Sequence, residues 1–425
     1  MAEAAAAAAE VTAAAPAAAD FVCQICCVGG FTSRNKLFKH VRVCSTGPTA
    51  QSQTKSIEVA GDDDSTLYLY VVGGRLRGRT LRSVERFCFA SNKWENCPLM
   101  MEGRGSHGAA GVGSVLYTIG GGGFHSNLSS CEAYDDLGAG GVGRKWRTVA
   151  GLGVSRHALA VAGTGDADDA IYAVGGWVDG TVCTGAVERY TPSTDRWESL
   201  APLLLPRRLH ALAAFPAQET VGAEAGTAAG QRSRDRLFVF GGNCDDPHWH
   251  TGSAEEYSPA ENTWKALPPM PGPGGGAAAV TVLPFVFVFR HGKHVLRFDP
   301  ATRAYLRLSD LPLPDWHCFG AVALPGSSQV CVHGGISAGS WSRAAFLYDA
   351  ATDAWSRMPD MTQARRRCGS AVLRQPRTEP VALALAEGAE EKEDEGVEAE
   401  GAQEAEEKEQ EATGAAPIAA KKQKL

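Results

Sequence analysis

The sequence lacks the segments that would insert the chain into a membrane or direct it across one. It has no run of about 18 apolar residues, so a membrane-spanning helix is not expected. Residues 1–19 have no basic start and no leucine-rich centre, which argues against a secretory signal. They also lack arginine, which argues against a transit peptide. We therefore expect a chain that stays in the cytoplasm, the nucleus or both.

The sequence also lacks the regular cysteine spacing of a secreted disulfide scaffold. Four of the 12 cysteines fall within residues 23–44, and the other eight are scattered singly through the rest of the chain. Scattered cysteines are typical of proteins from reducing compartments, where thiols stay free. This agrees with the expected localisation.

Strong net charge is absent outside one segment. The formal charge of the whole chain is −7, whereas residues 387–411 hold 13 acidic residues and two lysines, a local charge of −11. The remainder carries +4, three of these charges from Lys421, Lys422 and Lys424. This balance argues against a protein that coats nucleic acid over a broad surface.

The most informative feature that is present is a repeat. Five glycine pairs each follow a short apolar run, at Gly73-Gly74, Gly120-Gly121, Gly175-Gly176, Gly241-Gly242 and Gly334-Gly335. An aromatic residue follows 13 to 15 positions after the second glycine, at Phe87, Tyr134, Tyr190, Tyr257 and Tyr348. A tryptophan comes next, at Trp94, Trp146, Trp197, Trp264 and Trp355. A sixth copy is degraded: residues 285–289 lead to Phe298 and Tyr305, and Arg290-His291-Gly292 replaces the glycine pair.

This repeat predicts the fold. Self-similarity at about 50 residues per unit indicates stacked modules. Each unit predicts four short strands, with the apolar run as the second and the tryptophan in the fourth. One such sheet cannot bury both of its faces, whereas six packed around an axis can. The expected fold class is therefore all-β, a six-bladed β-propeller over residues 55–375.

The units resemble the kelch repeat. The resemblance rests on the glycine pair, the spaced aromatic and tryptophan, and a basic residue with a histidine that opens the next unit, as in Arg156-His157. The phrases VERYTPSTDRW and AEEYSPAENTW are most similar to propellers of the kelch-like adaptor proteins. Such propellers bind other proteins through loops on one face, usually with no chemistry. The kelch-like adaptors place a cullin-binding BTB domain before the propeller, but only 54 residues precede it in this chain, so no BTB-mediated cullin contact is expected.

A ring must be closed by a strand from one end of the chain. Two segments compete for the first strand of the first blade: residues 56–60, just before the first apolar run, and residues 368–373, after the last tryptophan. We favour the C-terminal segment, because a strand contributed by the far end of the chain locks the ring shut.

The regions outside the propeller differ in composition. Residues 1–19 form an alanine-rich tail, residues 20–45 a candidate zinc finger and residues 46–54 a polar linker. Residues 376–425 form an acidic tail with a basic end. Both tails are expected to be disordered, because they cannot bury enough apolar surface to fold alone.

Residues 20–45 resemble a single C2H2-type zinc finger with cysteine as the last ligand. Zn²⁺ takes four N or S ligands at tetrahedral geometry, and a cysteine knuckle followed by a helix supplies them. The candidate ligands are Cys23, Cys26, Cys27, His40 and Cys44. Cys26 gives a two-residue knuckle with Cys23, whereas Cys27 has the usual offset from the following phenylalanine; we lean to Cys26. Such a unit folds only with its single zinc ion.

The candidate finger is basic, with Arg34, Lys36, Lys39 and Arg42 and no acidic residue between Phe21 and Cys44. Its pattern is most like fingers of RNA-associated and ribosome-biogenesis factors, and the four cations allow contact with phosphates. One finger reads only about 3 base pairs, so binding to protein or to the shape of an RNA is as good an interpretation.

The loops after the glycine pairs are candidate partner-binding sites. They contain Arg75, Arg77, Arg79, Phe124, His125, Trp177, Asp179, His248, Trp249, His250 and Trp341. The first of these loops is strongly basic and fits an acidic partner, including the acidic tail of this chain. We interpret the recurring His107, His157, His210 and His317 as polar residues of the repeat that bond backbone groups of adjacent blades. The recurring Glu85, Glu132, Glu188 and Glu255 are interpreted as structural partners of nearby arginines.

Two other functions compete with a non-enzymatic interaction scaffold or adaptor. The first is an RNA-associated or ribosome-assembly factor that acts through the finger. The second is a kelch-type enzyme, which we disfavour because no compact Tyr/His/Cys constellation stands outside the repeat pattern.

Overall fold

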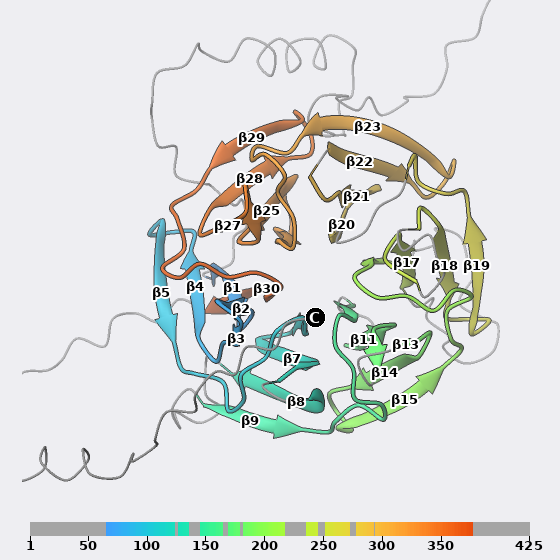
Figure 1. Ribbon diagram of the computed structural model, residues 1–425, viewed down its shortest axis with the longest axis horizontal. Helices are drawn as coiled ribbons and strands as arrows, with labels where there is room; N and C mark the ends of the chain where they lie inside the picture. Colours follow the sequence, from blue (N-terminus) through green and yellow to red (C-terminus); the bar gives the residue numbers. More distant parts are fainter. Residues whose placement is uncertain are drawn as a thin grey trace, which may run out of the picture. The chain divides into compact units, whose positions relative to one another are not determined.

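The structure is a computed structural model that describes residues 65–123, 126–135, 145–164, 169–178, 182–216, 235–244, 251–272, 278–292 and 294–376. Every regular element in these ranges is a β-strand, and six four-stranded antiparallel sheets surround one axis (Figure 1). The expected all-β, six-bladed propeller is confirmed. The candidate zinc finger and both tails lie outside the described residues.

The six sheets form blades 1 to 6, and the strands of each blade follow one another from the inner to the outer edge. Blade 1 contains β30 (Gly369–Pro376), β1 (Ser65–Val72), β4 (Val84–Cys88) and β5 (Lys93–Cys97). Blade 2 contains β6 (Gly108–Val112), β7 (Val115–Gly122), β8 (Asn127–Asp135) and β9 (Trp146–Val149). Blade 3 contains β10 (Ala160–Gly163), β11 (Ile171–Val174), β14 (Val187–Thr191) and β15 (Arg196–Leu200).

The other three blades follow the same order. Blade 4 contains β16 (Ala211–Phe215), β17 (Arg236–Phe240), β18 (Ala254–Ser258) and β19 (Thr263–Leu267). Blade 5 contains β20 (Ala278–Val282), β21 (Phe285–Phe289), β22 (His294–Asp299) and β23 (Ala304–Asp310). Blade 6 contains β24 (Gly320–Ala323), β25 (Gln329–His333), β28 (Ala345–Asp349) and β29 (Ala354–Arg357).

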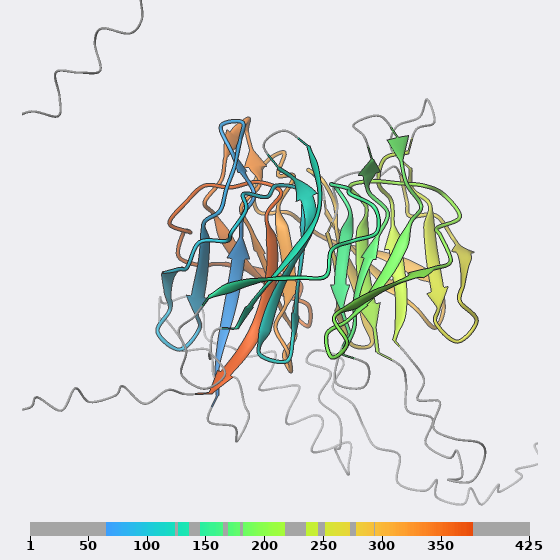
Figure 2. The same cartoon turned by 90° about the horizontal axis from the view of Figure 1, so that it is seen from below.

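Three blades also carry a short hairpin between their second and third strands. The hairpins are β2 (Arg75–Leu76) with β3 (Arg79–Thr80), β12 (Trp177–Val178) with β13 (Val182–Cys183), and β26 (Ile336–Ser337) with β27 (Ser340–Trp341). Figure 2 shows them projecting from one end of the ring, whereas β1 begins and β30 ends at the other.

The C-terminal strand closes the ring. β30 pairs with β1 in antiparallel register over eight residues, from Ser65 opposite Pro376 to Val72 opposite Gly369. The preference for residues 368–373 over residues 56–60 is therefore confirmed, and the strand extends three residues beyond the expected end.

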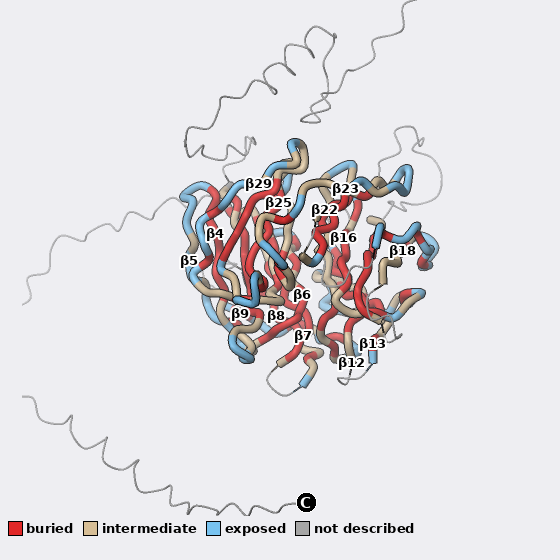
Figure 3. The backbone as a smooth tube through the Cα atoms, turned by 45° about the horizontal axis from the view of Figure 1, so that its top comes forward, coloured by how far each residue is buried: buried red, intermediate tan, exposed pale blue. Residues whose placement is uncertain are grey.

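The repeat residues hold neighbouring blades together. Each spaced aromatic lies directly across from its tryptophan on the adjacent strand, as in Tyr190 opposite Trp197. The indole N–H then donates to the preceding blade: Nε1 of Trp197 lies 2.8 Å from the carbonyl oxygen of Ala150. Equivalent bonds join Trp94 to Pro359, Trp146 to Pro98, Trp264 to Ala201 and Trp355 to Ser309. The buried residues gather on the second and third strands of the blades, and the outermost strands are largely exposed (Figure 3).

Glycine is required at these pairs because the backbone of the next connection comes too close for a side chain. Both glycines of every pair have positive φ, for example 55° at Gly73 and 100° at Gly74. A Cβ at Gly73 would lie only 2.7 Å from the carbonyl oxygen of Arg104 on the next connection. Other residues are disfavoured both by the left-handed conformation and by lack of space.

Four buried Arg–Glu pairs join successive blades and confirm the interpretation of the recurring glutamates. The pairs are Arg104–Glu132 at 2.7 Å, Arg156–Glu188, Arg207–Glu255 at 2.5 Å and Arg365–Glu85 at 2.7 Å. Three of the arginines also donate to the carbonyl of the first glycine of a pair: Arg104 to Gly120 at 3.0 Å, Arg207 to Gly241 at 2.8 Å and Arg365 to Gly73 at 2.8 Å. Where blade 5 meets blade 6, Trp316 takes this place: it is fully buried, and its Nε1 donates to the Gly334 carbonyl at 2.6 Å.

Candidate functional site

A chain of four backbone hydrogen bonds runs part of the way around the axis at the end of the propeller that carries the hairpins. Ser106 N donates to Arg367 O, Ala158 N to Ser106 O, Leu209 N to Ala158 O, and Arg367 N to Cys318 O, at 2.7 to 2.9 Å. All five residues have positive φ, between 51° and 56°, although none is glycine. We call Ser106, Ala158, Leu209, Cys318 and Arg367 the collar. Arg367 is its only charged member.

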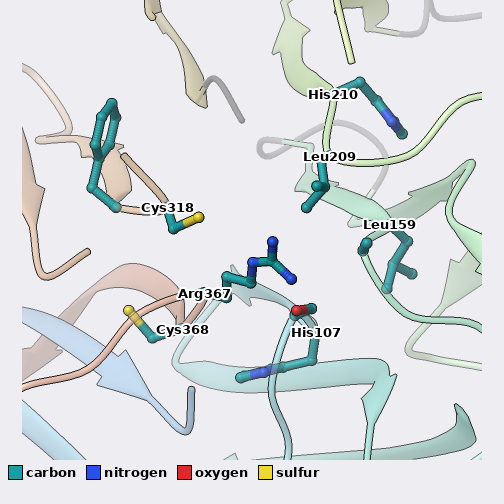
Figure 4. Close-up of a pocket in the computed structure, with 10 residues that line it drawn as sticks. His107, Leu159, Leu209, His210, Cys318, Arg367 and Cys368 are labelled. Carbon is teal, nitrogen blue, oxygen red and sulfur yellow. The ribbon is translucent and has the colours of Figure 1, made fainter. Parts of the chain in front are cut away.

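A cavity of about 120 Å³ lies at the collar. Besides the collar residues it is lined by His107, Leu159, His210, Phe319 and Cys368. Figure 4 shows the guanidinium of Arg367 extending into the middle of this space, with Cys318 and Leu209 at its sides. The cavity therefore has a cationic group at its centre.

Three more arginines lie beside Arg367. Arg75, in β2, exchanges backbone hydrogen bonds with Arg366 at 2.9 and 3.2 Å, and Arg208 exchanges them with Asn243. The side chain of Arg75 runs across blade 2, because Gly105 and Gly122 leave room for it. A Cβ at Gly105 would lie 2.5 Å from Arg75 Cγ. We call Arg75, Arg208, Arg366 and Arg367 the mouth arginines.

The mouth arginines lack anionic partners in the described part of the chain. None of the four forms an ion pair with a carboxylate there, although other arginines such as Arg104 and Arg207 do. The Nε atom of each is buried, with no hydrogen-bond partner among the described residues. Burial lowers the pKa of Arg75, and the charges of Arg367 and Arg366 lower it further. A buried donor left without an acceptor costs free energy, which an incoming anion would recover.

Aromatic side chains hold two of these guanidiniums in place. The Arg208 guanidinium lies over the Trp177 ring at 3.5 Å, and that of Arg366 lies over Trp341 at 4.7 Å. Such stacking fixes the plane of a guanidinium and leaves its edge free to donate. The channel mouth thus consists of the mouth arginines with Trp177, Trp341 and His157.

His157 lies near three of the mouth arginines, Arg75, Arg208 and Arg367. Its ring lies 5.4 Å from that of Trp177, and its Nδ1 is 2.6 Å from Asn127 Oδ1. Burial lowers the pKa of His157 to about 4, and the charges of Arg75, Arg367 and Arg208 contribute to the shift. His157 is therefore neutral at pH 7 and adds no charge to the mouth.

The sequence predicted part of this site. Arg75, Trp177 and Trp341 lie at the mouth, whereas Arg77 and Arg79 lie at the exposed tip of the β2–β3 hairpin. The remaining candidate loop residues lie outside the described residues: Phe124, His125, Asp179, His248, Trp249 and His250. So do the candidate zinc ligands Cys23, Cys26, Cys27, His40 and Cys44 and the basic residues Arg34, Lys36, Lys39 and Arg42.

Sequence reasoning missed Arg208, Arg366 and Arg367 as site residues. A signal was present, because Arg365 occupies the same place in its unit as Arg104 and Arg156. The residues one and two positions after it, Arg366 and Arg367, then fall at the mouth and in the collar.

The recurring histidines do not share one environment. His157 and His317 follow a buried residue directly and pair with the hairpin strands β12 and β26. His107 and His210 come later in their units and are buried. The interpretation that they bond backbone groups of adjacent blades is wrong for His107, because neither of its ring nitrogens has a hydrogen-bond partner among the described residues. Within that part of the chain, no group of three or more His, Cys, Asp or Glu residues is arranged to hold a metal ion.

Comparison with known proteins agrees with this architecture. A family model described as the kelch motif matches residues 67–101, 103–153, 167–204 and 232–271, which fall on blades 1 to 4. Blades 1 to 4 therefore carry kelch repeats. Kelch-like protein 26 of Danio rerio is 32% identical over 141 residues, which cover 32% of this chain and 22% of that protein. Kelch-like protein 25 of Xenopus tropicalis is 24% identical over 262 residues, which cover 58% of this chain and 39% of that protein.

The kelch propeller and its relatives fit a protein-interaction scaffold. The chain spans less than half the length of either relative. Among the residues of the kelch propeller that are described, no helix is long and apolar enough to cross a membrane.

Proposed function

We propose that this chain is a non-enzymatic interaction adaptor whose channel mouth binds an acidic segment of a partner protein. One observation carries the proposal: the four mouth arginines converge on one opening without an anionic partner in the described chain. Hydrogen bonds from guanidinium to carboxylate are among the strongest in proteins, and several partly desolvated donors at one place suit an anionic ligand.

The aromatic residues at the mouth support a protein ligand. Trp177 and Trp341 stand beside the arginines that they stack against. Arginine and tryptophan at the centre of an interface are the residues that contribute most to binding energy. The cations gather at a single opening instead of forming a long stripe, which favours a short peptide segment over a nucleic-acid backbone.

We further propose that the candidate finger at residues 20–45 provides a second contact and holds one zinc ion. Its basic residues suit an RNA or a second protein surface. The two contacts would let the chain bring two molecules together, as an adaptor does.

The proposal is tested by quantitative affinity capture with the full chain from nuclease-treated cell extract. The bait is compared with an Arg366→Gln/Arg367→Gln variant and with Arg196→Gln, a control that removes an exposed cation on the outer strand β15. We expect a set of proteins to be lost with the mouth variant and retained with the control. If every captured protein is retained by both variants, the mouth is excluded as the binding site.

The same experiment separates the competing functions. A Cys23→Ser bait tests the finger, and an untreated extract shows which partners depend on RNA. Partners that are lost with Cys23→Ser and on nuclease treatment, with no dependence on the mouth, would favour the RNA-associated function. Turnover of a captured small molecule by the purified chain would favour an enzyme.

A further inference from the structure

We propose that the group which enters the mouth is a phosphate carried on a side chain, so that phosphorylation of the partner switches binding on. This inference rests on the proposed function and specifies its ligand. It depends on the number of cations, their spacing around the collar and the polar lining beneath them.

The mouth arginines come from three separate segments that the ring brings together. Arg75 is in the β2–β3 hairpin of blade 1, Arg366 and Arg367 are in the connection between blades 6 and 1, and Arg208 is in the connection between blades 3 and 4. Arg367 belongs to the collar and lines the cavity, and Arg75 and Arg366 are joined to each other by backbone hydrogen bonds. Guanidinium donors therefore lie on more than one side of the opening, which suits a tetrahedral group better than a planar one.

The charge balance also favours phosphate over carboxylate. A carboxylate offers two oxygen atoms and a charge of −1, whereas a phosphate monoester offers three terminal oxygens and about −1.5 to −2 at pH 7. One carboxylate would leave most of the four guanidiniums unneutralised and still repelling one another. A phosphate offsets about twice as much positive charge and offers three acceptor oxygens to the guanidiniums.

The cavity at the collar, into which Arg367 extends, can hold such a group. Its volume is about 120 Å³, and the residues that line it include Ser106 and His107. Both are more than nine-tenths buried, and Ser106 Oγ and both His107 nitrogens have no hydrogen-bond partner among the described residues. A buried hydroxyl beside a guanidinium is a donor for a phosphate oxygen. The site thus offers neutral donors as well as charge.

The aromatic residues contribute rigidity. Because Arg208 and Arg366 are stacked on Trp177 and Trp341, their side chains lose little freedom when a ligand binds. Surface lysines could attract an anion without such support, but they would not hold a phosphate at fixed geometry. The mouth is therefore suited to selective binding and not only to attraction of negative charge.

The test measures peptide binding by the full chain. The probes are three fluorescent peptide pools with random flanking positions and a fixed central residue, which is phosphoserine, serine or aspartate. Anisotropy is recorded at about 150 mM salt, where weak surface attraction is screened. We expect the phosphoserine pool to bind at least about tenfold more tightly than the aspartate pool, a difference of about 1.4 kcal/mol. Inorganic phosphate should compete with it.

Variants show whether the mouth is responsible. Arg367→Gln and Arg75→Gln should each remove the preference for phosphoserine, whereas Arg196→Gln and Arg77→Gln should leave it unchanged. Arg367→Lys keeps the charge without the bidentate geometry and should bind with intermediate affinity. Urea unfolding of each variant establishes that the propeller is intact.

Two results would overturn the inference while leaving the proposed function in place. One is equal binding of the aspartate and phosphoserine pools with loss of both in Arg367→Gln, which means an acidic segment without phosphate. The other is a phosphoserine preference that falls equally in Arg196→Gln, which means attraction to overall charge. By contrast, partners that are captured equally well by the mouth variants and by the unchanged chain would contradict the proposed function itself.

Discussion

Arg365 donates from Nη2 to Oε1 of Glu85 at 2.7 Å, and this contact joins the last connection of the chain to its first blade. Arg365 also donates from Nη1 to the carbonyls of Gly73 and Ser83, at 2.8 and 3.0 Å, so its guanidinium bridges three points of blade 1. The charges are almost fully buried. The ring is thus closed by an ion pair as well as by the β1–β30 ladder.

Removal of Arg365 should open this junction. We expect Arg365→Ala to lower the free energy of unfolding by about 3–5 kcal/mol, because it leaves the carboxylate of Glu85 buried and unpaired. Arg366→Ala is the matched control, since Arg366 has no ion pair in the described chain, and it should cost less than about 1 kcal/mol. Urea denaturation followed by tryptophan fluorescence measures both. Equal losses would show that Arg365 has no special part in closure.

The first glycine of a pair should not tolerate a side chain. Gly73 and Gly78 both have positive φ, but a Cβ at Gly73 meets the Arg104 carbonyl at 2.7 Å, whereas nothing lies within 4 Å of one at Gly78. Gly78→Ala should therefore cost about 1–2 kcal/mol from backbone strain alone. Gly73→Ala should cost clearly more in the same urea titration. Similar losses at the two positions would mean that space is not limiting at Gly73.

Trp316 should stabilise the junction between blades 5 and 6 as strongly as the buried arginines stabilise the junctions that have Arg–Glu pairs. It is fully buried, packs against Phe319 and Phe346, and donates to the Gly334 carbonyl. Trp316→Ala should lower the free energy of unfolding by about 3–5 kcal/mol, as expected for a large buried aromatic. Trp316→Arg, which imitates the Arg–Glu junctions, should not restore stability, because Phe346 stands two residues before Tyr348, where blades 1 to 4 have glutamate. A stable Trp316→Arg protein in thermal melts would contradict this explanation.

Stability should fall as the solution becomes acidic, before the carboxylates titrate. Burial lowers the pKa of His107, His210 and His333 to about 3, against 6.5 for an ordinary histidine. Between these values the unfolded chain binds protons and the folded chain does not, so protonation favours unfolding. Stability is complete above about pH 6.5 and declines toward pH 3, by up to about 1.4 kcal/mol per pH unit for each histidine.

The window from pH 6 to pH 5 isolates the histidines from most carboxylates. Urea unfolding across this window should show a smaller slope for His333→Gln than for the wild-type chain. An unchanged slope would mean that His333 binds a proton in the folded state. His317→Gln serves as the control, because His317 lies at the solvent-accessible mouth end of its connection.

The candidate finger should bind one zinc ion per chain. Metal analysis of the purified full chain should give about one zinc, lost in Cys23→Ser and in His40→Gln, and retained in the propeller control Cys318→Ser. Comparison of Cys26→Ser with Cys27→Ser decides which cysteine is the ligand. Zinc that persists in Cys23→Ser would contradict the predicted ligand set.

The blades could be predicted because their information is local and repeated. Each glycine pair, aromatic and tryptophan forms contacts within one unit or with its neighbour, so the same residues recur at the same spacing. The degraded copy, which forms blade 5, was also recognisable from residues 285–289. The role of Trp316 was not, because an indole and a guanidinium share no sequence signal even when both donate to the same kind of carbonyl.

The mouth could be predicted only in part, because it depends on ring geometry. Arg75 follows a glycine pair and was found for that reason. Arg208 and Arg366 lie far apart in sequence and come to the same end of the ring only when the propeller is folded. The sequence also does not reveal the left-handed backbone of the collar. Ser106, Ala158 and Arg367 all have positive φ, although they are three unrelated residue types.

The pairing of β1 with β30 has a consequence for how the protein is made on the ribosome. The partner of Ser65 is Pro376, so the inner edge of the first blade stays unpaired until nearly the whole propeller has been translated. An unpaired edge strand is a template for pairing with other chains. The nascent chain therefore exposes this edge for most of its synthesis, and truncated products that end before β30 should be the ones that aggregate.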